Sequence, residues 1–123
     1  EKTINNEEII INGDGTDKLD FTYIDDLMNG VYKIIVNKKS INQIFNITFG
    51  NARKITDMLN LVKKNFKNVK VTYEKRDKLI PKRGTLSTHK AKKLLNFKSS
   101  HPLESGFLKY IKWYKSKKIF FKN

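Results

Sequence analysis

The spacing of apolar residues changes twice between residues 43 and 73, and this change restricts the class of fold. Residues 43–49 place Phe45, Ile47 and Phe49 on one face, as a β-strand does. Residues 52–66 space their apolar side chains at intervals of three and four, as an amphipathic helix does. Residues 69–73 alternate again with lysine and threonine, which indicates a strand with one wet face. The sequence therefore predicts a mixed α/β fold in which the helix packs against a sheet.

The remaining segments add further short strands and helices. Residues 8–12 predict a strand that runs into the turn at residues 13–15, and residues 19–23 predict a second extended piece. Helices are predicted over residues 25–36, over residues 88–96 and from Pro102 onward, because proline suits the first position of a helix. The complete expectation is about four helices and three to four short strands.

Length and composition exclude several classes of protein. A chain of 123 residues fits one domain with a single modest core. It contains no cysteine, which excludes a disulfide framework, a thiolate metal site and a cysteine nucleophile. Its longest apolar runs fall far short of the roughly 20 residues of a membrane span. Glu1, Glu7 and Glu8 stand where a secretory signal needs a basic start and an apolar run, so we expect a cytoplasmic protein.

The net charge of +14 suggests a polyanionic partner, but its distribution leaves three interpretations open. Residues 1–30 hold eight Asp and Glu against Lys2 and Lys18, so that 24 of the 26 Lys and Arg follow them. These cations are spread through every predicted helix. The three interpretations are a solvated lysine-rich surface, a site for a phosphate-bearing small ligand and a surface that binds nucleic acid.

Seven stretches, in order and at fitting distances, resemble the extended short-chain dehydrogenase/reductase family, which includes NAD-dependent sugar-nucleotide epimerases and dehydratases. The most informative are the glycine turn Gly13-Asp14-Gly15 and the run Asp20-Phe21 that leads into Asp25-Asp26. The resemblance covers residues 8 to 116. The stretches are residues 10–16, 20–27, 45–47, 83–87, 90–97, 103–107 and 110–114.

The resemblance implies the carboxyl-terminal part of a Rossmann-type enzyme, without its amino-terminal Rossmann half. Residues 1–116 would form the substrate-binding portion and residues 117–123 a basic and aromatic tail. In the family, the Rossmann half binds NAD or NADP through a glycine-rich loop and carries a Tyr-x-x-x-Lys pair. We therefore expect no catalytic residue, no bound cofactor and no metal in this chain. The whole enzyme would bind a nucleotide sugar and form a homodimer.

Five positions of the family's nucleotide site are carried over to this sequence. Gly13 borders the nucleotide, and Arg76 and Arg83 are the candidates for binding its diphosphate, because a guanidinium donates two parallel hydrogen bonds. The other two positions are Asn12 and Leu19, where many members have a base-stacking aromatic residue and a phosphate-binding arginine. Neither role passes to an asparagine or a leucine, so the identity of the nucleotide stays open.

Other functions and sites compete with this interpretation. A stand-alone nucleic-acid-binding module would stack bases on aromatic residues, but most of these fall on predicted core faces. A noncatalytic scaffold descended from the family is a further alternative. Asp25 and Asp26 fit helix capping better than paired-carboxylate chemistry. Asn46 is predicted to be a buried hydrogen-bonding residue, and His89 and His101 have no partners in sequence that favour metal binding.

Overall fold

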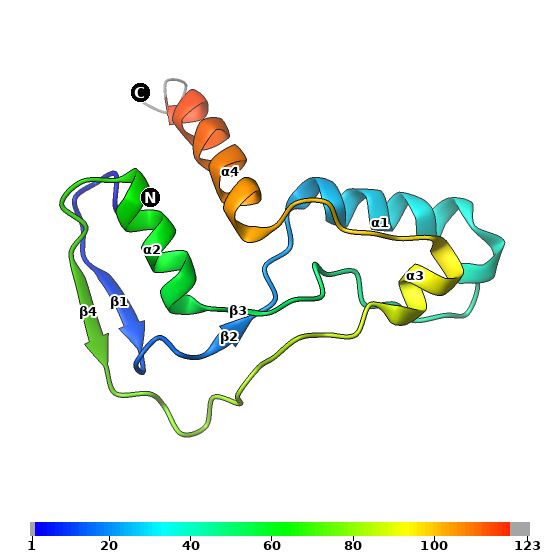
Figure 1. Cartoon of the computed structure of the whole chain (residues 1–123), viewed down its shortest axis with the longest axis horizontal. Helices are drawn as coiled ribbons and strands as arrows, with labels where there is room; N and C mark the ends of the chain where they lie inside the picture. The colour runs from blue at the N-terminus through cyan, green and yellow to red at the C-terminus, as the bar shows by residue number, and fades with distance from the viewer. Residues whose placement is uncertain (1, 119–123) are drawn as a thin grey trace. The chain divides into compact units, whose positions relative to one another are not determined.

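The computed structural model describes residues 2–118, and the chain divides into two compact units. Unit 1 joins the residues up to Leu19 with Ala52–Thr85. Unit 2 joins Asp20–Asn51 with the residues from Leu86 onward. Each unit therefore combines segments that are far apart in the sequence, as the colours of Figure 1 show.

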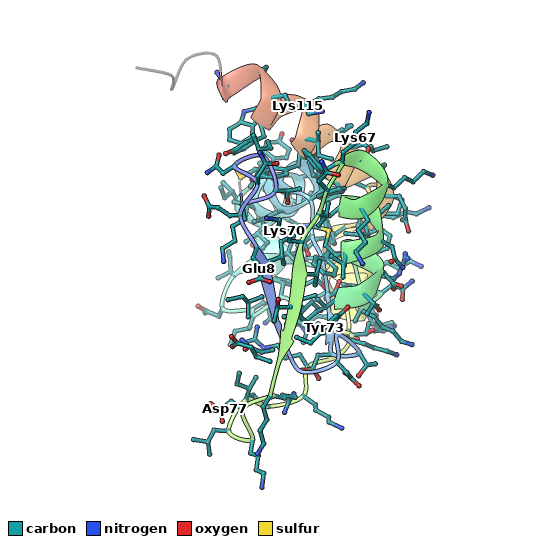
Figure 2. The ribbon with its side chains drawn as sticks, turned by 90° about the vertical axis from the view of Figure 1, so that its left-hand side faces the viewer. Glu8, Lys67, Lys70, Tyr73, Asp77 and Lys115 are labelled. Carbon is teal, nitrogen blue, oxygen red and sulfur yellow. The ribbon has the colours of Figure 1, made fainter. Side chains whose placement is uncertain are left out.

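Unit 1 is built from two strand pairs and one helix. Strand β1 (Ile9–Asn12) pairs in parallel with β4 (Val71–Glu74), with Ile9 opposite Val71 and Asn12 opposite Glu74. Strands β2 (Lys18–Leu19) and β3 (Arg53–Lys54) form a second, antiparallel pair. Figure 2 shows β1 and β4 side by side, with Glu8 close to β4, where the Thr72 hydroxyl donates a hydrogen bond to the Glu8 carboxylate.

Helix α2 (Ile55–Asn65) follows β3 directly in unit 1. Its start is fixed by Asp57, whose carboxylate accepts hydrogen bonds from the Lys54 backbone N–H at 3.1 Å and from the Arg53 guanidinium at 3.0 Å. An acid in the first turn also complements the helix dipole. Leu59 is the buried residue of the helix, and Ile11 of β1 and Ala52 are buried in the same unit. The helix predicted over residues 52–66 therefore begins later, because residues 53–54 pair with β2.

Unit 2 is helical and holds a packed core. It contains α1 (Ile24–Val36), a short 3₁₀ helix η1 (Lys38–Ser40), α3 (His89–Leu95) and α4 (Leu103–Lys118). The buried cluster consists of Ala91, Leu95 and Phe97, and Ile34, Phe45, Ile47 and Leu94 pack against it. From α4, Leu103, Phe107 and Ile111 are also buried.

Gly30, in the middle of α1, lets the chain come close to residues 43–49. A Cβ atom at this position would lie 2.3 Å from Cγ2 of Ile47 and 3.2 Å from Cε2 of Phe97. Glycine normally weakens a helix by roughly 0.5–1 kcal/mol relative to alanine. Here the missing side chain is what allows Ile47 and Phe97 to pack against the helix.

The predicted fold class is confirmed: the chain is mixed α/β, with four α-helices and four short strands among residues 2–118. The strand predicted for residues 43–49 is wrong, because no strand forms there. A strand needs a neighbour for its backbone hydrogen bonds, and none pairs with this segment within the described residues. The side chains of this segment still alternate between core and solvent, since Phe45 and Ile47 pack against the core whereas Ile44 is 87% exposed. Of the predicted tail, residues 119–123 lie outside the described part.

Candidate functional site

A cavity of about 410 Å³ lies in unit 1, between β1, the residues around β2, helix α2 and the loop at residues 80–83. This volume falls in the range of small-molecule sites, roughly 300–1,000 Å³. Its walls are aliphatic, with Ile9 and Ile11 from β1 and Ile55, Met58 and Val62 from α2. The spacing of these α2 residues places them on one face of the helix. This is the apolar face that was predicted to pack against a sheet, and it forms part of the cavity wall.

Polar side chains contribute to the same cavity from three segments. They are Asn12 at the end of β1, Asp17 and Lys18 before and in β2, and Arg83 in the loop. An apolar space with a few polar groups is the usual composition of a binding site for a small organic molecule. The cavity can therefore hold an apolar or aromatic group and contact charged groups of the same ligand.

The turn Gly13-Asp14-Gly15 closes the end of β1. Gly13 and Gly15 have φ angles of +86° and +76°, a region that glycine adopts without strain. The Asp14 carboxylate accepts hydrogen bonds from the Thr16 hydroxyl at 2.6 Å and from the Thr16 N–H at 2.9 Å. The hydroxyl bond, above all, holds the pKa of Asp14 below its ordinary value. The Gly15 carbonyl accepts from the Thr56 N–H, which ties the turn to α2.

Arg76 joins the turn to the loop that follows β4. Its Nε donates to Oδ2 of Asp17 at 2.7 Å, and its Nη2 donates to the carbonyl of Ile80 at 2.7 Å. A Cβ atom added to Gly13 would lie 3.3 Å from Cβ of Arg76, so the glycine allows this close approach. The guanidinium therefore already has partners within the chain.

The five positions carried over from the family all lie in unit 1. Asn12, Leu19 and Arg83 line the cavity. Gly13 contacts Arg76, and Arg76 pairs with Asp17 in the cavity wall. The structure thus brings these positions together, and it adds Asp17, which the sequence analysis did not single out.

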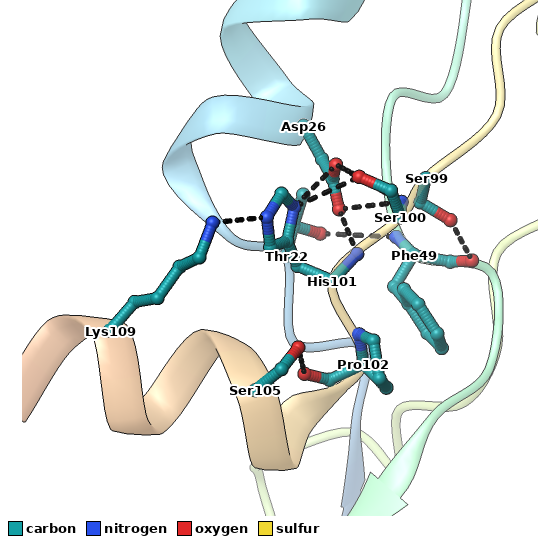
Figure 3. Close-up of polar contacts among 9 residues, drawn as sticks. All are labelled: Thr22, Asp26, Phe49, Ser99, Ser100, His101, Pro102, Ser105 and Lys109. Atoms are coloured by element: carbon teal, nitrogen blue, oxygen red, sulfur yellow. Dashed lines mark hydrogen bonds and ion pairs between the residues drawn. The ribbon is translucent and has the colours of Figure 1, made fainter.

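A second polar cluster lies in unit 2, around the buried carboxylate of Asp26 (Figure 3). Asp26 is only 3% exposed. It accepts hydrogen bonds from the Ser100 N–H and hydroxyl and from the His101 N–H, at 2.8 to 3.1 Å. Nδ1 of His101 lies 2.9 Å from its Oδ1. The expectation that Asp26 caps its own helix is wrong, because all these partners come from the segment before α4.

Lys109 completes this cluster and fixes the tautomer of the histidine. Its Nζ lies 2.7 Å from Nε2 of His101. A lysine ammonium has no acceptor, so Nε2 must accept the hydrogen bond and Nδ1 carries the proton that is donated to Asp26. Both nitrogen atoms of the imidazole ring therefore have a hydrogen-bond partner, Asp26 at Nδ1 and Lys109 at Nε2. It holds the segment before α4 against the start of α1.

The hydrogen bonds around Asp26 also determine its acidity. Burial raises the pKa of this carboxyl, but the bonds from the His101 side chain and backbone and from Ser100 outweigh it and hold the pKa below its ordinary value. Asp26 is therefore ionised in the folded chain at neutral pH, and charge-assisted hydrogen bonds compensate its burial. No spacing in the sequence indicated this pairing, because Asp26 and His101 are 75 residues apart.

The described residues do not contain the strand–loop–helix segment to which a nicotinamide dinucleotide binds in a Rossmann fold. Such a cofactor binds where a glycine-rich loop connects a strand to the amino terminus of a helix. The Gly13-Asp14-Gly15 turn follows β1 but leads into β2, and the next helix of unit 1 begins only at Ile55. We therefore assign no step of cofactor chemistry to this chain. Nor do three His, Asp or Glu side chains converge as metal ligands within residues 2–118.

Phe97 and Tyr73, two aromatic residues that could stack bases, differ in how accessible they are. Phe97 is 2% exposed in the core of unit 2, whereas Tyr73 is half-exposed on β4 of unit 1. Asn46, predicted to be buried, is exposed, although its Nδ2 donates to the Ser87 carbonyl at 3.0 Å. Among the helices of the described part, none combines the length and apolar character that crossing a membrane requires.

Comparison with known proteins confirms the resemblance predicted from the sequence. Residues 1–48 match the model of the NAD dependent epimerase/dehydratase family. UDP-glucuronic acid 4-epimerase from Bacillus cereus, solved with UDP-glucuronic acid and NAD, is 29% identical with a TM-score of 0.80. The match covers 92% of this chain and 38% of the epimerase chain. No curated protein matches the chain significantly.

Two more distant structures share the fold. An epimerase from Methanothermobacter thermautotrophicus has a TM-score of 0.90 at 21% identity, over 97% of this chain and 36% of its own. UDP-glucose 4-epimerase from Thermotoga maritima, solved with UDP-glucose, has a TM-score of 0.82 at 24% identity, over 94% of this chain and 37% of its own. The chain thus spans little more than a third of the length of these epimerases.

Proposed function

We propose that this chain is the substrate-binding, carboxyl-terminal portion of an NAD(P)-dependent sugar-nucleotide epimerase or dehydratase. Residues 1–116 would form this portion, and catalytic and cofactor-binding residues would lie in a region of the enzyme that the chain does not cover. One observation carries the proposal: a fold shared with epimerases solved with UDP sugars has a cavity beside the Gly13-Asp14-Gly15 turn. A cytoplasmic enzyme fits this proposal.

In this proposal the cavity of unit 1 holds the nucleotide end of the substrate. The base and ribose would contact the aliphatic walls, where removing their surface from water is favourable. Asn12 lies at the position where many family members have a stacking aromatic residue, and its amide both donates and accepts hydrogen bonds. Lys18 and Arg83, which also line the cavity, supply positive charge for the diphosphate.

The proposal also accounts for apolar surface that unit 2 leaves uncovered. On α1, Leu27, Met28 and Ile35 are exposed, the last of them by 75%. In residues 43–49, Ile44 is exposed as well. A surface of this kind marks an interaction site. We assign it to the cofactor-binding region of the enzyme.

Calorimetric titration of the chain with UDP and ADP tests this function. We expect one of them to bind at one site. Met58→Trp fills the cavity and should weaken the binding at least about tenfold, because a steric clash replaces a favourable contact. Met28→Trp is the matched control: it makes the same change at an exposed position of α1 and should leave binding unaltered.

The result that contradicts the function is the absence of nucleotide binding together with tight binding of DNA or RNA. Such binding would weaken steeply with salt, because it depends on the release of counter-ions from phosphates. It would identify the lysine-rich surface as the functional one.

A further inference from the structure

The guanidinium of Arg76 is occupied by partners of its own chain. Nε donates to Asp17 at 2.7 Å, Nη2 donates to the Ile80 carbonyl at 2.7 Å, and Nη1 lies 3.4 Å from the Asp77 carbonyl. The two side chains of the ion pair are only 25% and 27% exposed. A pair at this depth is screened by salt less than a pair on the surface. The positive charge of Arg76 is therefore balanced by the carboxylate of Asp17 within the same chain.

Asp17 is placed where it affects a ligand of the cavity. It lines the cavity next to Lys18 and Leu19, and its carboxylate accepts the hydrogen bond that Nε of Arg76 donates. A diphosphate oxygen has the same charge and the same acceptor geometry as this carboxylate oxygen. The two anions would thus compete for one set of donors, and they would repel each other if both were present.

We propose that Asp17 is a specificity-determining residue, an internal counter-ion of Arg76 that lowers the affinity of the cavity for a nucleoside diphosphate. This inference rests on the proposed function, because it takes the cavity to be the nucleotide site. A diphosphate that enters the cavity has to displace the Asp17 carboxylate from Arg76. An uncharged nucleoside meets no such competition.

The substitution Asp17→Asn tests the inference in the full chain, with UDP, pyrophosphate and uridine as probes. Removing the carboxylate charge should raise the affinity for UDP and pyrophosphate about tenfold, the size of one charge-assisted hydrogen bond. The affinity for uridine should not change. In the double variant Asp17→Asn with Arg76→Gln, the gain should disappear, since the donors that it depends on are gone.

Asp57→Asn is the matched control. Asp57 also pairs with an arginine of unit 1, Arg53, at 3.0 Å, but neither residue lines the cavity. The control removes the same charge from the same unit and should raise UDP affinity far less than Asp17→Asn. An equal gain in both variants would show a general effect of net charge and would overturn the inference. A gain that persists without Arg76 would overturn it as well.

A measurement on the unsubstituted chain keeps the test independent of how the variants fold. The NMR signal of the Arg76 Nε–H should shift when UDP is added, because a phosphate replaces the Asp17 carboxylate as its acceptor. A signal that stays unchanged while UDP binds would overturn the inference and leave the proposed function intact. If neither UDP nor uridine binds to the chain or to Asp17→Asn, the proposed function itself fails.

Discussion

The two units use their apolar residues in different ways. Unit 2 packs Ala91, Leu95 and Phe97 into a core, and its buried carboxylate, Asp26, has a full set of hydrogen-bond donors. Unit 1 buries Ile11 and Leu59, but leaves a cavity of about 410 Å³ between β1 and α2. Protein interiors are normally close-packed, whereas a concave, mostly aliphatic space of this size that is open to solvent is typical of a small-molecule site.

Under the proposed function, this difference corresponds to two separate roles of the units. A unit with a packed core and a fully hydrogen-bonded buried carboxylate provides rigidity, whereas a unit with a mostly aliphatic concave space provides a place for a ligand. Substitutions in unit 2 should therefore change stability and leave nucleotide affinity alone. The reverse should hold for substitutions in the cavity wall of unit 1. The following predictions test this separation, beginning with the largest expected effect.

Phe97→Ala should lower the free energy of unfolding by about 3–5 kcal/mol, the usual cost of removing a buried phenylalanine. Urea denaturation followed by the fluorescence of Trp113, the single tryptophan and a residue of α4, measures it. Tyr32→Ala, at an exposed position of α1, is the control and should change stability by less than about 0.5 kcal/mol. Similar losses in both variants would show that unit 2 lacks the tightly packed core described above.

Asp26→Asn should lower the free energy of unfolding by about 2–4 kcal/mol at neutral pH, because it removes a buried charge whose donors stay in place. The folded pKa of Asp26 lies below its unfolded value of about 3.9. The ionised Asp26 therefore stabilises the folded chain fully at pH values above the unfolded pKa. This stabilisation is lost as the pH falls through the folded pKa.

The difference between this variant and the original chain should accordingly shrink below about pH 4. Urea denaturation at several pH values measures it. Asp25→Asn changes the exposed neighbouring acid and serves as the control. A difference that stays constant down to the lowest pH would contradict the ionised state assigned to Asp26.

Gly30→Ala should cost about 1–3 kcal/mol, although alanine favours a helix, because the added methyl group would overlap Ile47. Thermal unfolding measures the loss. Asn29→Ala, at the exposed neighbouring position of α1, should instead stabilise the chain slightly. If Gly30→Ala also stabilises the chain, residues 43–49 do not pack against α1 as described.

Local patterns in the sequence were enough to predict much of this fold. The helical spacing of α1 and α2, the β-branched run of β1 and the alternation around β4 depend on neighbouring residues, and these elements formed as expected. Residues 43–49 did not, because strand pairing depends on a partner that local spacing cannot supply. The same limit applies to the Asp26–His101 contact, which joins residues 75 positions apart.

The candidate site was predictable in its position but not in its chemistry. The glycine turn and Arg76 were identified from the resemblance, and the structure brings both beside the cavity of unit 1. The pairing of Arg76 with Asp17 was not, because it links residues 59 positions apart across two loops. An arginine that has a carboxylate partner and one that is open to a ligand look the same in a sequence.

The most direct test of the central claim is a titration with UDP followed by methyl NMR, since both units contain isoleucines that report separately. We predict that signals of the cavity residues Ile9, Ile55 and Met58 shift on binding, whereas those of Ile34 and Ile111 in unit 2 stay in place. Shifts confined to unit 2, or no shifts at saturating UDP, would contradict the assignment of nucleotide binding to unit 1.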